Sequence, residues 1–514
     1  MVVMVAIGTI RRRSAILACI LAALSLASPT GASARPRSDA IAPVRLRVME
    51  FNIEYGGDVV DFHSVIRAIR ASHADVVGIE EAWGKTALIA DRLGWAYADR
   101  RMQLISRFPL LDPPGADGLY TFVQLAPGRV VAIGNVHLPS AAYAPRKILL
   151  EGASRNDVLA LERARRLPAL RPSARALAGL ADAGIPSFLL GDFNSPSQLD
   201  WTRETVGTLP QIRFPLRWPA TALMERLGFR DSYREAHPDP LRTPGLTWPS
   251  GRRRTPDGWN PGKYAAHDRI DFVFAGGPAR TVRSTIVGES GAADVGIAID
   301  PWPSDHRAVV STFSVRPGVP PTMVAVSSRL VTSGDTLDVT FHAPGEADGR
   351  VAIVPAGGDP ATGPVVAERS TAGATDGTLT FPTEAFAPGA FQAVLEGSSG
   401  ELARIPFWVQ AAGAGPQIAT TQPAYPKGAS ITVTWHGAPG NRWDWIGIYR
   451  AGADPNVASY LDWLYTGATI EGSATFDRDA HGAWPLPPGD YSVYLLEDDA
   501  YHAVAAGRFT VTAA

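Results

Sequence analysis

The stretch "FLLGDFNSPS" (residues 188–197) begins with an apolar run that is typical of a buried strand and then turns polar. An acid, Asp192, and an amide, Asn194, stand at the end of that run, and a proline follows two residues later. A strand that ends in this way delivers polar groups to a loop at the edge of a sheet, where binding and catalytic residues concentrate. Its meaning depends on what other strand ends carry.

Several other apolar runs in the first three hundred residues are strand-like, with helical stretches between them. The helical stretches include residues 64–71 and 157–184, and the second contains Pro168 and Pro172, so we expect it to be bent or split. Strands that alternate with helices indicate an α/β domain with mixed sheets. The predicted strands span residues 44–51, 75–80, 129–138, 187–193, 269–274 and 307–315.

Polar residues stand at the edge of each predicted strand. Taken singly, each could merely cap a turn or a helix, or find an ordinary hydrogen bond. Six such coincidences instead predict that the strand ends converge on one acidic, oxygen-rich pocket. The residues are Asn52, Glu80, Glu81, Asn135, His137, Asp192, Asn194, Asp268, Asp271, Asp305 and His306.

Six ordered motifs within residues 43–316 resemble the endonuclease/exonuclease/phosphatase superfamily, which has the deoxyribonuclease I-like fold. They are "EFN", "GIEEAW", "NVHL", "GDFN", "DRIDF" and "SDHRAV". The resemblance implies a four-layer α/β sandwich for the catalytic domain. It also implies a metal-dependent phosphoric ester hydrolase, in which an activated water attacks the phosphorus.

The resemblance further implies a metal site. Glu81 would be the main metal carboxylate, with Asn52 and Asp305 close to the ion. Oxygen donors without thiolates suit a hard divalent cation, so we expect Mg²⁺, with Mn²⁺ or Ca²⁺ as alternatives. The residue before the metal glutamate is often Gln in this family. Here it is Glu80, which is expected to add negative charge beside the site.

Two strand ends supply the groups that the resemblance assigns to the water and the phosphate. Asp192 would align and deprotonate the attacking water, Asn194 would bond to a phosphate oxygen, and His137 would donate to the phosphate. In this assignment, the strand within "FLLGDFNSPS" brings its acid and its amide to the scissile bond.

The resemblance gives His306 the task of stabilising the charge of the transition state, oriented by a carboxylate of "DRIDF". That stretch offers both Asp268 and Asp271, because branches of the family place the orienting acid differently. We favour Asp271, since a residue within a strand is better fixed than one in a loop.

The substrate is the least determined part of the prediction. Inositol polyphosphate 5-phosphatases carry "PSWCDR" where this chain has "AAHDR", which does not support their specificity. The loop 250–268 combines basic and aromatic residues. This combination suits binding of single-stranded nucleic acid or of an anionic membrane, and it is also compatible with a plain solvated loop. Its candidate substrate-binding residues are Arg252, Arg253, Arg254 and Lys263, beside Trp259 and Tyr264.

Net charge adds weight to a polyanionic substrate. Residues 43–318 hold 34 Lys and Arg against 29 Asp and Glu, a net charge of +5. We therefore favour a phosphodiesterase acting on nucleic acid. The alternatives are a sphingomyelinase-like phosphodiesterase of phospholipid head groups, a phosphomonoesterase, and a non-catalytic surface-binding protein.

The C-terminal part is organised differently. Pro/Gly linkers at 316–322 and 411–417 mark the starts of two units. The stretch "SGDTLDVTFH" (333–342) in the first unit aligns with "KGASITVTWH" (427–436) in the second. Short alternating strands in units of about a hundred residues predict two Ig-like β-sandwiches, over 323–411 and 417–514. With 9 basic against 20 acidic residues from Val319 onward, they suit a spacer or an adhesion module that contacts a cell surface or polymer.

The N-terminus has the pattern of an export signal. Arg11 to Arg13 precede an apolar run over 15–27, and Ala32-Ser33-Ala34 offers a cleavage site, so residues 1–34 are expected to be removed. The protein would then be secreted or periplasmic, without a transmembrane segment in the mature chain. The single cysteine, Cys19, lies in the signal, which leaves no disulfide, thiolate site or cysteine nucleophile.

Overall fold

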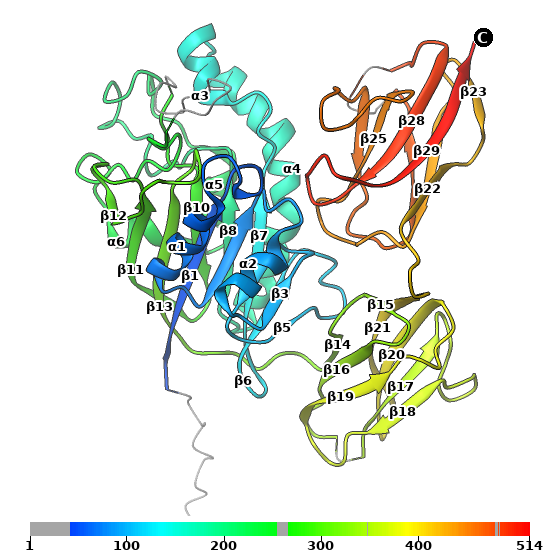
Figure 1. Cartoon of the computed structure of the whole chain (residues 1–514). Helices are drawn as coiled ribbons and strands as arrows, with labels where there is room; N and C mark the ends of the chain where they lie inside the picture. Colours follow the sequence, from blue (N-terminus) through cyan, green and yellow to red (C-terminus); the bar gives the residue numbers. More distant parts are fainter. Residues whose placement is uncertain (1–41, 254–265, 347, 479–481, 483, 514) are drawn as a thin grey trace, which may run out of the picture. The chain divides into compact units, whose positions relative to one another are not determined.

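A seven-stranded sheet forms the first layer of strands in the computed structural model of the chain (Figure 1). Its order is β12-β11-β13-β1-β2-β4-β3, and β1 pairs in parallel with β2 but antiparallel with β13, so the sheet is mixed as expected. The strands are β1 (Val44–Asn52), β2 (Val76–Glu80), β3 (Tyr97–Asp99), β4 (Leu104–Ser106), β11 (Ala279–Gly288), β12 (Val295–Ala298) and β13 (Ala308–Val315).

A second sheet of six strands has the order β5-β6-β7-β8-β10-β9. The apolar part of "FLLGDFNSPS" lies at its centre, where β8 pairs in parallel with β7 and antiparallel with β10. The strands are β5 (Leu110–Leu111), β6 (Thr121–Ala126), β7 (Arg129–His137), β8 (Ser187–Asp192), β9 (Arg230–Asp231) and β10 (Asp271–Gly276).

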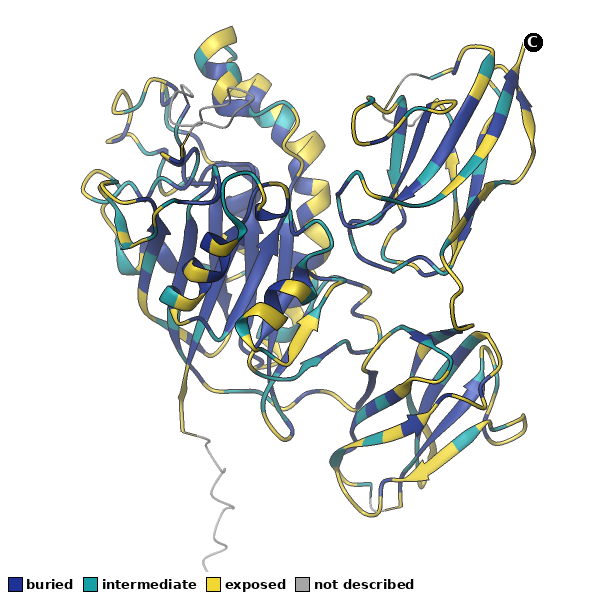
Figure 2. Ribbon diagram, viewed as in Figure 1, coloured by how far each residue is buried: buried dark blue, intermediate teal, exposed yellow. Residues whose placement is uncertain are grey.

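The two sheets pack face to face, and helices cover their outer faces. One apolar core lies between the sheets and joins Val48 of β1 to Phe188 of β8. Two further cores attach the helices, and Figure 2 shows the central strands buried between them. The helical elements are α1 (Phe62–Ser72), α2 (Thr86–Leu93), α3 (Ala144–Arg146), α4 (Arg155–Asp182), α5 (Pro219–Arg226), α6 (Ser232–Ala236), η1 (Tyr55–Gly57) and η2 (Lys147–Glu151).

The resulting order is helix, sheet, sheet, helix. Helices α1 and α2 cover the first sheet, and α4 and α5 cover the second. Apolar residues on both faces of the central strands bury each sheet from two sides, which explains why these strands read as continuous apolar runs. The α/β expectation is confirmed.

Helix α4 is not split, because it runs unbroken for 28 residues with both prolines inside it. Pro168 and Pro172 lie on its exposed side. Each proline frees the carbonyl group four residues earlier, and on the exposed side water can satisfy that group. The helix is fixed from its other side, where Leu170 and Leu177 enter the core beneath β7 and β8.

Two β-sandwiches follow, and each consists of a three-stranded and a five-stranded sheet that share one apolar core. The first comprises β14 (Met323–Val326), β15 (Leu330–Thr332), β16 (Thr336–His342), β17 (Arg350–Pro355), β18 (Ala367–Ser370), β19 (Asp376–Pro382), β20 (Gly389–Gly397) and β21 (Gly400–Gln410). The second comprises β22 (Gln417–Thr420), β23 (Ala424–Pro426), β24 (Ile431–His436), β25 (Trp445–Arg450), β26 (Asp462–Tyr465), β27 (Gly472–Phe476), β28 (Gly489–Leu496) and β29 (Ala503–Thr512).

The internal repeat of the sequence is reproduced in the strand order. The sheets of the first sandwich are β14-β16-β19 and β15-β21-β20-β17-β18, and those of the second are β22-β24-β27 and β23-β29-β28-β25-β26. Adding eight to each strand number converts one pair of sheets into the other. The aligned segments "SGDTLDVTFH" and "KGASITVTWH" end in the equivalent strands β16 and β24.

The structure describes residues 42–253, 266–346, 348–478, 482 and 484–513. From Ala42 onward the chain forms one compact unit. The expected signal peptide, Arg254 and Lys263 lie outside the described residues. No helix within the described ranges has the length and apolar character needed to cross a membrane.

Position 191 in β8 requires glycine. Its φ is +138°, and a Cβ atom there would lie 1.8 Å from the carbonyl oxygen of Val136 on β7. We expect Gly191→Ala to lower the free energy of unfolding by about 3 kcal/mol or more, measured by urea denaturation. Gly179→Ala on the exposed side of α4 meets nothing within 4 Å and should instead add up to about 1 kcal/mol. Equal stability of the two variants would contradict this assignment.

Candidate functional site

Three residues of the second sheet form a row at one end of the space between the sheets. The pairing register sets His137 of β7 beside Asp192 of β8, and Asp192 beside Asp271 of β10. Side chains alternate along a strand, and Phe188 and Leu190, which share the parity of Asp192, belong to the core between the sheets. The row therefore continues that core in polar form.

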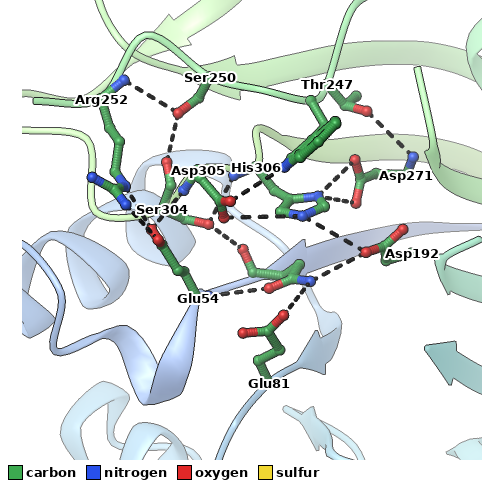
Figure 3. Close-up of polar contacts among 12 residues, drawn as sticks. Glu54, Glu81, Asp192, Thr247, Ser250, Arg252, Asp271, Ser304, Asp305 and His306 are labelled. Carbon is green, nitrogen blue, oxygen red and sulfur yellow. Dashed lines mark hydrogen bonds and ion pairs between the residues drawn. The ribbon is translucent and has the colours of Figure 1, made fainter. Parts of the chain in front are cut away.

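His306, just before β13, closes the row. Its Nδ1 lies 2.9 Å from Asp271 Oδ1 and 3.1 Å from Oδ2, and its Nε2 lies 3.7 Å from Asp192 Oδ2 (Figure 3). Burial alone would lower the pKa of His306, but the carboxylates of Asp271 and Asp192 outweigh it and raise the pKa well above the ordinary value. The imidazole is therefore a buried cation held between two acids at neutral pH.

Of the two carboxylates that the sequence offered for orienting His306, Asp271 makes the contact. Asp268 is engaged elsewhere: its oxygens accept hydrogen bonds from Tyr143 Oη at 2.9 Å and from Trp201 Nε1 at 3.1 Å. Burial raises the pKa of Asp268 to about 6. Asp268 thus braces the loop between β9 and β10, with no contact to the His306 ring.

Asp192 lies at the centre of the site. Burial raises its pKa to about 6, against the opposing effect of His306. His137 Nε2 lies 3.6 Å from Asp192 Oδ2. The backbone N–H of Asn194 donates to Asp192 Oδ1 at 2.7 Å, which fixes the carboxylate at the strand end.

Asn194 supports Asp192 through its side chain as well. Its Nδ2 donates to Asp192 Oδ2 at 3.0 Å and to the carbonyl oxygen of Leu138 at 3.1 Å. The predicted contact between this amide and a phosphate oxygen requires one of these bonds to break. In the structure, the amide positions the carboxylate.

Two residues from the first sheet reach the same place. Asn52 pairs with Glu80 across β1 and β2, and its Nδ2 lies 3.3 Å from both Glu81 Oε1 and Asp192 Oδ2. Glu81 follows β2 with a φ of +56°, an unfavourable conformation for a residue other than glycine. The amide of Asn52 therefore joins the acids at the ends of the two sheets.

Asp305 completes the acidic group beside His306. Its Oδ2 accepts a hydrogen bond from Trp248 Nε1 at 3.2 Å, and its backbone N–H donates to Glu54 Oε2 at 2.9 Å. Burial raises the pKa of Asp305, His306 opposes that shift, and Glu81 adds to it. Neither Glu54 nor Trp248 was among the predicted site residues, although Glu54 stands only two residues after Asn52.

The donor chemistry of this end of the sheets fits a hard divalent cation. Glu81 and Asp305 offer carboxylate oxygens, which Mg²⁺ prefers. Asn52 turns its Nδ2 toward Glu81, and its Oδ1 accepts a hydrogen bond from the backbone N–H of Glu54 at 3.1 Å. The electrostatic repulsion between Glu81 and Asp305 would be relieved by a cation. Asp192, Asp271 and His306 also bring their donor atoms within 4.8 Å of one another. Asp271 and His306 Nδ1 already satisfy each other. Glu81, Asn52 and Asp305 remain the predicted metal ligands.

The arginine cluster predicted for substrate binding is not available as such. Arg252 is buried and forms a bidentate ion pair with Glu54, in which its Nε lies 2.6 Å from Oε2. A buried guanidinium needs a paired acid. Because Glu54, just after β1, is that acid, the pair holds the loop after Trp248 against the end of β1. Arg253 is exposed. The prediction that Arg252 binds substrate is wrong.

Glu80 does not add negative charge to the site as expected. It is fully buried between the sheets, and burial raises its pKa well above the ordinary value. Its neighbour Glu50 is equally buried, and burial together with Asp271 and Glu80 raises the pKa of Glu50 as well. Both shifts favour the protonated forms of the carboxyl groups, although Glu50 opposes the shift of Glu80.

A model of the Endonuclease/Exonuclease/phosphatase family matches residues 49–306, which is half of the chain and holds every site residue described above. The chain belongs to this family. An uncharacterised protein of Caenorhabditis elegans, F14F9.5, is 29% identical over 295 residues, which cover 52% of this chain and 91% of that protein.

Solved structures of endonuclease/exonuclease/phosphatase proteins also match, at low identity. One from Beutenbergia cavernae is 17% identical and covers 71% of this chain and 99% of its own, with a TM-score of 0.33. TDP2 of D. rerio, solved with a single-strand DNA product, is 14% identical and covers 53% of this chain and 99% of its own, also with a TM-score of 0.33.

Asp192→Asn tests the predicted base. The amide keeps the shape of the carboxylate but cannot accept a proton, so kcat should fall on the order of 10²–10⁴-fold. Metal affinity, measured by calorimetry, and the melting temperature should change little. A variant that retains wild-type kcat would remove Asp192 from this role.

Glu81→Gln and Glu80→Gln form a matched pair. We expect Glu81→Gln to raise the metal concentration needed for half-maximal activity about 10- to 100-fold, because a ligand charge is lost. Excess metal should restore part of the activity. Glu80→Gln should leave the metal requirement unchanged, because Glu80 is already neutral. A similar response of both variants to metal titration would contradict the division between them.

Proposed function

We propose that the protein is an exported, divalent-metal-dependent phosphoesterase that hydrolyses phosphodiesters by attack of an activated water. The observation that carries the proposal is the row of Asp192, Asp271 and His306, with Glu81 and Asn52 opposite it. A phosphodiester is anionic and resists attack by water, so its hydrolysis needs a base, a cation and neutralisation of charge. The site offers each of these.

The residues divide the chemistry among themselves. Asp192 aligns the water and takes its proton, for which a pKa of about 6 is suited near neutral pH. The His306 cation, held by Asp271, stabilises the negative charge that develops on the phosphoryl oxygens, and His137 donates to the phosphate. A divalent ion held by Glu81, Asn52 and Asp305 would supply a Lewis acid for the phosphoryl oxygen.

The choice of substrate has to be revised on the described residues. The preference for nucleic acid depended on the arginines of the loop 250–268, and Arg252 is bound to Glu54. The net charge of +5 remains as support for a polyanionic substrate. The burial of Arg252 does not weaken the phospholipid and phosphomonoester alternatives. Export and the Ig-like character of the two sandwiches remain proposals from the sequence.

Metal-dependent hydrolysis of bis(p-nitrophenyl) phosphate tests the proposal. The full-length protein should release p-nitrophenol with Mg²⁺ or Mn²⁺, lose this activity with EDTA and regain it when metal is restored. Asp192→Asn purified in parallel controls for contaminating hydrolases. If no phosphodiester is hydrolysed with any divalent ion, a non-catalytic binding protein becomes the better explanation.

A further inference from the structure

A cavity of about 560 Å³ opens beside the predicted catalytic residues. Glu81 and His137 line one side of it, and residues of the second sandwich line the other. We call it the aromatic pocket, after the rings of Tyr55, Trp83, Trp445, Tyr460, Tyr465 and Tyr501 that line it. The chemistry described above uses only its catalytic side.

The rings form a continuous series from the catalytic centre into the second sandwich. The backbone N–H of Tyr55 donates to Glu81 Oε2 at 2.9 Å, so the series starts at the predicted metal carboxylate. Ring centroids are 4.9 Å apart between Tyr55 and Trp83, and 6.1 Å apart between Trp83 and Tyr501. Trp445 lies 5.7 Å from both Tyr501 and Tyr460.

Polar bonds fix this wall to the catalytic half of the chain. Arg442 donates to the carbonyl oxygen of Asn135 at 3.0 Å, two residues before His137. Asp498 accepts hydrogen bonds from the backbone N–H of Gly84 at 2.8 Å and from Gln103 Nε2 at 2.5 Å. The second sandwich, expected from the sequence to be a spacer or an adhesion module, therefore borders the site.

The first sandwich has the same strand order without the aromatic pair of Trp445 and Tyr465. Trp445 pairs with Tyr465 across β25 and β26, and the equivalent pair across β17 and β18 is Arg350 with Ser370. Moreover, Tyr460 and Tyr465 are 41% and 43% exposed, so core packing does not explain them. A ligand does.

The charge of the aromatic pocket restricts that ligand. Asp499 lines it and accepts a hydrogen bond from Tyr465 Oη at 2.8 Å. Among the described lining residues, Arg442 is the one guanidinium or ammonium group, and it is bound to backbone carbonyls. Electron-rich ring faces beside a carboxylate attract partly positive C–H and ammonium groups, and they repel a second phosphate.

We propose that the second sandwich forms the substrate-selecting wall of the site, and that it binds a small non-anionic group esterified to the phosphate, with a C–H face of the sugar or choline kind. This inference rests on the proposed phosphodiesterase function. It assigns to the rings the group on one side of the scissile phosphate, with the phosphate itself at Glu81 and His137. A continuous nucleic acid strand does not suit this wall.

The test compares full-length variants on chromogenic diesters. Tyr460→Ala/Tyr465→Ala removes two exposed rings, and Tyr97→Ala is the control, because Tyr97 is similarly exposed (37%) but lies on β3, away from the aromatic pocket. The substrates are p-nitrophenyl phosphorylcholine, the p-nitrophenyl diester of glucose 6-phosphate, and methyl p-nitrophenyl phosphate as the minimal diester. Tyr460→Ala alone serves where the double variant is unstable.

We expect the double variant to lower kcat/KM for a head-group diester, relative to the minimal diester, about 10-fold, while Tyr97→Ala keeps the wild-type ratio. The head-group diester whose kcat/KM falls in the double variant shows whether the wall binds a sugar or a choline group. An unchanged ratio in the double variant would overturn the proposal. So would a wild-type preference for DNA with a steep salt dependence.

A binding measurement separates this inference from the proposed function. Without metal, phosphorylcholine or glucose 6-phosphate should quench tryptophan fluorescence in the wild type, and about 10-fold higher concentrations should be needed in the double variant. If no diester is hydrolysed but this binding is seen, the proposed function fails and the wall stands. Hydrolysis of diesters without any such binding would contradict only the proposed substrate-selecting wall.

Discussion

The ion pair between Asp271 and His306 is the interaction on which the site depends. The space between the two sheets holds four buried carboxyl groups at its polar end: Glu50, Glu80, Asp192 and Asp271. Such a group costs several kcal/mol if it is ionised and unpaired. Burial raises the pKa of Glu50 and of Glu80, which favours their neutral forms, whereas Asp271 and Asp192 have the His306 cation beside them. Removing the cation would therefore disturb every acid around it.

The second constraint on the site is the shape of the loops that leave the strands. Several residues other than glycine have a positive φ there, which costs free energy that the surrounding packing must offset. Asn194 has a φ of +47° while bonding Asp192 and Leu138, and Glu81 has a φ of +56° while bonding Asn52. In both cases the hydrogen bonds hold a conformation that the free chain would avoid.

The sequence predicted the catalytic half well, because its strands are long, apolar and end in recognisable motifs. The strand starting at Ser187 and the pairing of Asp271 with His306 both follow from position within a motif. What it could not predict were contacts between segments far apart along the chain. The Glu54–Arg252 pair joins residues 198 apart, and a run of three arginines gives no sign that one is buried.

Charge state was a further limit of sequence reading. Glu80 appears as an added negative charge when only its neighbours along the chain are considered. Its protonation follows from full burial beside Glu50, a residue thirty positions earlier. The aromatic residues of the second sandwich were similarly ambiguous, because a tryptophan in a β-sandwich is usually a core residue. Trp445 is itself buried, so only the exposure of Tyr460 and Tyr465 and the neighbouring Glu81 and His137 distinguish this group.

The shared strand order of the two sandwiches has a consequence for how such an enzyme can diversify. Two copies of one architecture stand in tandem, yet the positions of Trp445 and Tyr465 in the second correspond to Arg350 and Ser370 in the first. After a duplication, one copy is free to vary at its rim while the strands of both are conserved by folding. Under the proposed role of the second sandwich, substrate preference can thus change through an appended module, with no change at any of the predicted catalytic residues.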